Sequence, residues 1–323
     1  MKKLKINNNF YIKFNILLII ILVIFFILNI SACNNNSLSS KTSIATEISK
    51  NSENSIFNPD EVIAVETFLA DITQNITNGR INISALIPIG VDPHEFEPTP
   101  KDFNKISKAK IIIINGGGIE GWLEKALKNT ASNAYIINAS EGLGDPKNPD
   151  PHFWLDPNYV INYVQNITNG LIKEDPNGKD IYLKNSENYI LKLQDLDKWI
   201  KNEVSILPVE NRLIITNHES FNYFAKRYGF KIIGTIIPNV SSDAEVSAKQ
   251  FADLVNKVKE SKAKAIFLET GTNPALANQL ASETGIKVVN NLYTHSLSDK
   301  NGVAPTYIDM LKFDTKAIVD NLK

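Results

Sequence analysis

The residues best suited to chemistry in this chain are its histidines, of which the 323 residues contain only four. They lie in polar loop-like segments rich in acidic, proline and aromatic residues: His94, His152, His218 and His295. A neutral imidazole offers a nitrogen lone pair to a cation and is the commonest protein ligand for transition metals. Since four such groups complete the tetrahedral shell of an ion such as zinc, one shared metal site is the first hypothesis.

The positions of the four histidines relative to the predicted strands decide whether they can meet. A single loop histidine is usually solvated or caps a helix. These four, however, follow predicted strands over residues 81–87, 134–138, 212–216 and 287–289, respectively. In an open α/β sheet, ligands bind beyond the carboxyl ends of the strands. All four histidines map to that end, which predicts one converging site.

The rest of the folded part alternates short Ile/Val runs with segments of helical period, from about residue 61 onward. This pattern predicts parallel sheets with helices on both faces, because continuous apolar strands are covered on both sides. An Asp-Pro pair at Asp156 and Pro157 resembles a helix N-cap followed by proline in the first turn. The further predicted strands are 62–65, 110–114, 231–236 and 265–268, and the predicted helices are 67–77, 99–107, 121–129, 220–228, 244–260 and 274–284.

One segment interrupts this alternation and predicts a long amphipathic helix over 180–206, which Pro208 ends. The helix divides the alternation into two blocks, so we expect an N-terminal α/β lobe over 60–178, a linking helix over 179–207 and a C-terminal α/β lobe over 208–323. No internal sequence repeat is evident. The apolar positions of the helical pattern are Ile181, Leu183, Tyr189, Ile190, Leu193, Leu196, Trp199, Ile200 and Val204.

The first 59 residues are set apart from the fold. Lysines precede an apolar run over 16–28, and Ile30-Ser31-Ala32-Cys33 resembles a bacterial lipobox. These features predict a lipoprotein signal peptide over 1–32 and a lipid on Cys33, the alternative being an uncleaved signal anchor. Residues 33–59 are rich in Asn, Ser and Thr and predict a flexible tether. Cys33 is the only cysteine, which excludes intramolecular disulfides.

Other site types have weaker support. The net charge of −1 and the lack of a basic stripe argue against nucleic acid as a partner. Glycines 116–118 follow a strand and could cradle a phosphate. They lack the lysine and hydroxyl of a P-loop, so a tight turn is preferred.

A metal hydrolase is a further alternative, since Glu95 and Glu219 adjoin histidines and could act as general bases. The sequence has no His-x-x-x-His pair to support a zincin. Phe153 and Trp154 are expected to pack around the site and exclude solvent.

Three motifs carry a family resemblance: Gly90–Pro100, Asp150–Pro157 and Asn217–Gly229. They resemble the metal-binding solute-binding lipoproteins of zinc and manganese ABC importers, over the chain from about Glu61 to Lys323. The resemblance implies two Rossmann-like lobes with parallel sheets, joined by one long α-helix, that clasp one divalent cation with little hinge movement. It also implies a monomeric binding protein rather than an enzyme. That protein is lipid-anchored outside the bacterial cytoplasmic membrane, in the periplasm or at the cell surface, and its partners are an ABC permease and its ATPase subunit.

The same resemblance maps the family's first three ligands onto His94, His152 and His218. Many members carry an aspartate at the fourth position, where this chain has His295. Four imidazoles favour Zn²⁺, whereas Mn²⁺ favours carboxylate oxygen and remains the alternative cargo. If His295 faced away from the ion, Glu269, Asp299 or water could complete the shell. An adhesin role, sometimes attached to this family, stays open.

Overall fold

Two parallel four-stranded sheets form the framework of the protein, seen in a computed structural model that describes Phe57, residues 61–145 and residues 147–323. The described part belongs to one compact unit, Ser55–Lys323. The first sheet has the order β2-β1-β3-β4 and consists of β1 (Val62–Ala64), β2 (Ser84–Ala85), β3 (Ile111–Ile114) and β4 (Tyr135–Asn138). The second has the order β6-β5-β7-β8 and consists of β5 (Leu213–Thr216), β6 (Lys231–Thr235), β7 (Ala265–Glu269) and β8 (Lys287–Leu292).

The helices cover these sheets on both faces, which confirms the predicted α/β class. Those before the second sheet are α3 (Thr67–Thr77), α4 (Pro100–Lys108), α5 (Leu123–Thr130), α6 (Pro157–Glu174) and α7 (Lys179–Ser205). Those after its first strand are α8 (Asn222–Tyr228), α9 (Ala248–Glu260), α10 (Ala275–Thr284) and α11 (Tyr307–Leu322). Short 3₁₀ turns are η1 (Phe153–Leu155), η2 (Pro176–Gly178) and η3 (Val209–Asn211).

The two sheets have the same strand order relative to the chain, a repeat that is not evident in the sequence. In each sheet the first strand in sequence lies between the second and the third. The order of the strands therefore reverses between the first and the third strand of each sheet. Open α/β sheets leave a crevice for a ligand at such a reversal. The predicted strand over 81–87 was too long, because β2 covers Ser84 and Ala85, although the Leu86 N–H still donates to the Ala64 carbonyl of β1.

The strands are uniformly apolar because both of their faces are buried. Val62 and Ala64 of β1 face a central core that also receives side chains from α3, α6, α7, α8 and α11. Ile63 and the paired Ile112 face a smaller outer core beneath α4 and α5. The second sheet has an equivalent outer core beneath α9 and α10.

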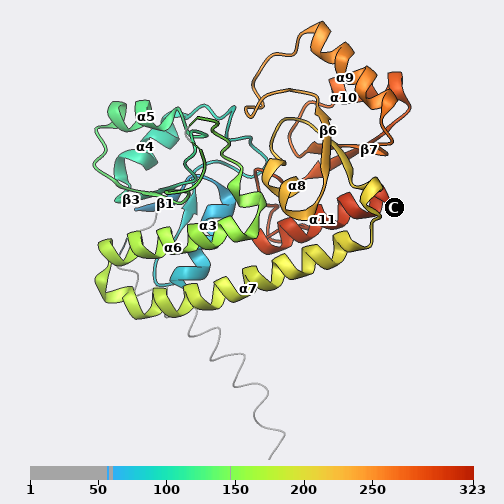
Figure 1. The fold of residues 1–323 in the computed structure, drawn as a ribbon. Coiled ribbons are helices and arrows are strands. Elements are labelled where there is room, and N and C mark those ends of the chain that lie inside the picture. Colours follow the sequence, from blue (N-terminus) through green and yellow to red (C-terminus); the bar gives the residue numbers. More distant parts are fainter. Residues whose placement is uncertain (1–56, 58–60, 146) are drawn as a thin grey trace, which may run out of the picture. The chain divides into compact units, whose positions relative to one another are not determined.

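The long helix α7 connects the two halves and packs against both. It has 27 residues, and it contacts α3 and α6 on one side of the link and α8 and α11 on the other (Figure 1). Buried side chains of both sheets and of α7 belong to the same central core. Because this core is continuous, a wide separation of the two halves would expose apolar surface to water.

The predicted apolar face of α7 is correct except near its start. Ile181 and Leu183 are 41% and 39% exposed. Tyr182 is buried in their place, because its hydroxyl donates to Asp175, which precedes the helix in the chain. The polar anchor fixes the first turn of the helix and turns its aliphatic neighbours outward.

Polar side chains cap the two helices, α4 and α6, that follow the loops of His94 and His152. Thr99 and Asp102 form a capping box at α4, with Pro100 in the first turn. Asp156 accepts a hydrogen bond from the backbone of Asn158 at the start of α6, which confirms the predicted cap. These caps fix the ends of the loops that carry His94 and His152.

The predicted signal peptide over 1–32 and the lipid site Cys33 lie outside the described residues, as does most of the predicted tether over 33–59. Phe57 is described, is half-buried and packs against the central core. No helix in the described ranges is long and apolar enough to cross a membrane.

The packing of α7 gives a matched test of the continuous core. Leu193 is fully buried and Leu191 is 58% exposed on the same helix. We expect Leu193→Ala to lower the free energy of unfolding by about 2–5 kcal/mol, through lost burial and a residual cavity. Leu191→Ala should change it by less than about 0.5 kcal/mol. Denaturant unfolding measures both, and equal effects would contradict the described packing.

Candidate metal centre

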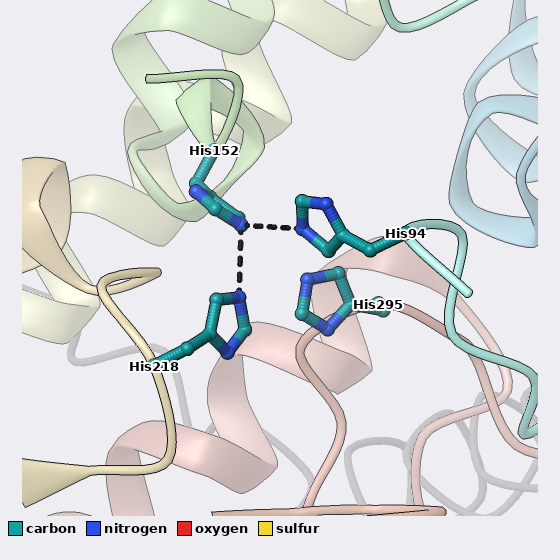
Figure 2. Close-up of side chains that lie close together, drawn as sticks. All are labelled: His94, His152, His218 and His295. Atoms are coloured by element: carbon teal, nitrogen blue, oxygen red, sulfur yellow. Dashed lines mark hydrogen bonds between the residues drawn. The ribbon is translucent and has the colours of Figure 1, made fainter. Parts of the chain in front are cut away.

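The four histidines converge at the carboxyl ends of the two sheets. They come from the loops after β2, β4, β5 and β8, so each sheet supplies two of them. One ring nitrogen from each histidine lies within 4.8 Å of all the others. His152 Nε2 lies 3.2 Å from His94 Nε2 and 3.2 Å from His218 Nε2 (Figure 2).

Three of the four rings are buried in the protein. His152 and His218 have no exposed surface, and His295 is 6% exposed. His94 is only half-buried. His295 Nε2 is buried without a hydrogen-bond partner among the described residues. A buried unpaired nitrogen is unfavourable unless a ligand meets it, so its lone pair is available to a cation.

Carboxylates lie against the outer nitrogens of the buried rings. Asp150 Oδ1 lies 2.8 Å from His152 Nδ1. Glu269 serves two rings, with one oxygen 3.1 Å from His218 Nδ1 and the other 3.0 Å from His295 Nδ1. A carboxylate on Nδ1 favours the tautomer that leaves the Nε2 lone pair free and raises the basicity of the ligand.

Both Asp-Pro-His segments of the sequence use the same local device. Asp92 Oδ1 accepts the backbone N–H of His94 at 2.9 Å, and Asp150 Oδ1 accepts that of His152 at 3.1 Å. An aspartate that bonds the backbone two residues further on makes an Asx turn, and the proline between them stiffens it. Sequence reasoning assigned no hydrogen bond to Asp92 or Asp150, although the repeated Asp-Pro-His triplet was a usable signal.

The Trp154 ring lies against the buried side of the cluster, whereas Phe153 packs against Tyr159 and Tyr223. The Trp154 ring lies 5.2 Å from that of His152 and 5.7 Å from that of His295, between ring centroids. It stacks on Phe68 and donates its indole N–H to the carbonyl of Thr294. This hydrogen bond joins the loop after β4 to the loop after β8, one from each half.

The charges around the cluster divide the histidines into two kinds. Burial, followed by the nearby His295 and His152, lowers the pKa of His94 to about 3. Burial and the neighbouring imidazoles hold the pKa of His152 well below its usual range. Both rings are therefore neutral at pH 7 and ready to bind a cation.

His295 and Glu269 behave differently. Burial alone would lower the pKa of His295, but the carboxylates of Glu269 and Asp92 outweigh it and raise that pKa. Burial would likewise raise the pKa of Glu269, but the charges of His218 and His295 hold it well below its usual range. A fixed negative charge therefore lies behind the cluster and offsets part of the charge of an incoming cation.

The remaining candidate residues lie outside the four-histidine cluster. Asp299 is exposed and accepts a hydrogen bond from the backbone of Asn301, so the structure does not bring it to the cluster. Glu95 is exposed and Glu219 is half-buried. Gly116 does lie in a tight turn with a φ of 82°, and its N–H donates to Glu120 rather than to a phosphate.

A second group of possible ligands overlaps the first. Atoms of Asp92, Glu269 and His295 lie within 4.8 Å of one another. His295 thus faces imidazoles on one side and carboxylates on the other. Of the residues that sequence reasoning proposed as alternative ligands, Glu269 is the one that the structure places beside the cluster.

Known proteins similar to this chain are metal-binding components of transporters. Residues 62–321 match the family described as the periplasmic zinc-uptake complex component A. The manganese-binding lipoprotein MntA of Halalkalibacterium halodurans is 33% identical over 272 residues, which cover 81% of this chain and 88% of that protein. The manganese ABC transporter substrate-binding lipoprotein PsaA of Streptococcus mitis is 31% identical over 276 residues, which cover 81% of this chain and 89% of that protein.

Solved structures agree on the fold. The manganese-bound periplasmic metal-binding protein of Candidatus Liberibacter asiaticus matches with a TM-score of 0.72 and 29% identity, over 81% of this chain and 99% of that one. The periplasmic zinc-binding protein TroA of Treponema pallidum matches with a TM-score of 0.75 and 24% identity, over 81% and 98%. At that lower identity, the second match concerns the fold alone.

The carboxylate behind His152 gives a direct test of the centre. We expect Asp150→Asn to weaken binding of a divalent cation by about 10–100-fold, because the ring loses its negatively charged partner. Asp145→Asn is the control, since Asp145 is exposed and forms a similar local turn with Lys147. Titration calorimetry with zinc measures both, and equal affinities of the two variants would contradict a role for Asp150.

Proposed function

The chain belongs to the family of periplasmic zinc-uptake components A, and from this membership we propose that it captures one divalent metal ion, preferably zinc, with His94, His152, His218 and His295. It is the substrate-binding component of a metal ABC importer and not an enzyme. The observation that carries the ligand assignment is the convergence of four imidazole nitrogens in a buried centre.

The preference for zinc rests on the chemistry and spacing of the ligands. Zinc binds imidazole nitrogen at about 2.0–2.1 Å, so nitrogens at the corners of a tetrahedron around it lie about 3.3–3.4 Å apart. The two contacts made by His152 Nε2 are 3.2 Å. For an all-nitrogen site, affinity also rises from manganese towards zinc and copper.

Manganese remains the second candidate, because carboxylates also reach the centre. Asp92 and Glu269 lie close to His295, and a harder ion with more oxygen ligands could use them. The relatives MntA and PsaA are named for manganese. The choice between the two ions therefore depends on whether His295 or a carboxylate completes the shell.

The ligand set favours capture over catalysis. A catalytic zinc keeps a coordination position open for water, whereas four protein imidazoles occupy all four positions of a tetrahedral ion. A closed shell suits a protein that holds an ion until it is transferred. This arrangement argues against the metal hydrolase considered from Glu95 and Glu219.

The capture protein works outside the cytoplasmic membrane. Importers of this class also contain a permease and an ATPase subunit, with which it acts. The relatives MntA and PsaA are named lipoproteins. We infer that this protein also carries a lipid, on Cys33, which anchors it to the membrane as a monomer. The continuous central core favours small movements of the two halves when the ion binds and leaves.

The fourth ligand gives the sharpest test of metal choice. We expect wild-type protein to prefer zinc to manganese in competition titrations. His295→Asp should narrow the ratio of the two affinities by at least about tenfold, because an oxygen ligand replaces a nitrogen. Metal analysis of protein purified without chelator provides an independent measurement. A manganese preference in the wild-type protein would overturn the zinc assignment.

The binding of metal should weaken as the solution becomes more acidic. His94 and His152 have lowered pKa values and are neutral at pH 7, so protons compete little with a metal ion for their nitrogens. His295 has a raised pKa, so a proton must leave it when the ion binds. We expect the affinity for zinc to fall as pH falls, beginning above the ordinary histidine pKa of about 6.5. Calorimetry between pH 8 and pH 5 measures it, and constant affinity would contradict the assignment.

A further inference from the structure

One of the four histidines is held much less firmly than the others. His152, His218 and His295 are buried, and carboxylates lie against their outer nitrogens. His94 is half-buried, and among the described residues the hydrogen-bond contact of its Nδ1 is with the hydroxyl of Ser241, at 3.5 Å. A ligand with fewer restraints is the one that can leave the ion at the lowest free-energy cost.

A cavity reaches the cluster on the side of this histidine. It has a volume of about 470 Å³, and His94 is the only one of the four histidines that lines it. Its walls come from both halves of the chain, including the turn at Gly117 and Gly118 and, across from it, Ser241 and Asp243. An ion that arrives through this cavity therefore meets His94 before the other ligands.

A hydrogen bond between the halves controls the position of the His94 loop. Ser242 Oγ donates to Asp92 Oδ2 at 2.7 Å, and the other oxygen of Asp92 accepts the backbone N–H of His94. Ser242 belongs to the loop after β6 and is buried. Asp92 thus connects the backbone of a candidate ligand to the opposite half of the protein.

The same loop is held at a second point. Gly90 N–H donates to Ser296 Oγ at 2.8 Å, next to His295. Gly271 approaches Gly90 so closely that a Cβ on Gly271 would lie 2.6 Å from the Gly90 carbonyl oxygen. The loop is therefore fixed at Gly90, and the segment that carries Asp92 and His94 is held to the opposite half by the Asp92–Ser242 hydrogen bond.

We propose that the metal ion enters and leaves past His94 through this cavity. We also propose that the opening of the Asp92–Ser242 hydrogen bond sets the rate at which the ion is released. Asp92 and Ser242 are positioning residues, because they act on the ion through the backbone of His94. When their bond breaks, the loop can move His94 away and expose the ion to the cavity, without a separation of the central core. The inference rests on the proposed metal capture.

The first test removes the Ser242 hydroxyl. Zinc release into an excess of chelator, followed by stopped flow, should be about tenfold faster for Ser242→Ala, as expected for the loss of one hydrogen bond to a charged group. Ser242→Thr keeps the hydroxyl and should restore the wild-type rate. The absorption spectrum of bound cobalt should be the same in all three proteins, since the ligands do not change.

Ser132→Ala is the matched control. Its hydroxyl donates to the carbonyl of Ile106 within the first half of the chain, away from the cluster. We expect wild-type release from this variant. An unchanged rate in Ser242→Ala, or equal acceleration in Ser132→Ala, would overturn the role of the hydrogen bond. If the wild-type protein bound no zinc, the proposed zinc capture would fail, and titration of the wild-type protein separates that failure from a failure of the hydrogen-bond role.

The second test concerns the route. Asp243 is exposed and lines the cavity. Asp243→Lys should slow zinc association several-fold at low ionic strength, because it reverses a charge beside the path. Asp253→Lys, with the same change on the exposed side of α9, should not. Equal effects of the two variants would overturn the route.

Discussion

The arrangement of the centre depends on the mutual repulsion of nitrogen lone pairs in a buried space. Two unprotonated imidazole nitrogens 3.2 Å apart repel each other unless a proton or a cation lies between them. The protein holds His152 in two such contacts and places the Trp154 ring 5.2 Å from it, between ring centroids. Protons are disfavoured on His94 and His152 by burial, so a divalent cation is the partner that relieves the repulsion.

The framework around the centre supplies the free energy that this repulsion costs. Asp150 orients His152 by bonding both its ring and its backbone, while Glu269 lies between two rings from different loops. Glu269 is itself held by Ser220, whose hydroxyl donates to it at 2.9 Å. His94 is the exception, since it is half-buried and its Nδ1 lies 3.5 Å from the hydroxyl of Ser241.

Much of this architecture was predictable from the sequence. The Ile/Val runs located the strands because both faces of each sheet are buried, and the strand ends located the four histidines. Two features were not predictable. The short β2, with Ser84 and Ala85 paired to β1, is not marked within the run over 81–87, and the outward turn of Ile181 depends on a hydrogen bond between Tyr182 and Asp175. Apolar periodicity alone contains neither.

The continuous central core has a consequence for how the protein unfolds. Its side chains come from both sheets and from α7, so neither half possesses a complete interior of its own. The two halves should then melt together, as one cooperative transition, although each has the strand order of a self-sufficient α/β domain. Because the four histidines come equally from the two sheets, an ion bound by them would stabilise the whole of this transition and link the folding of one half to that of the other.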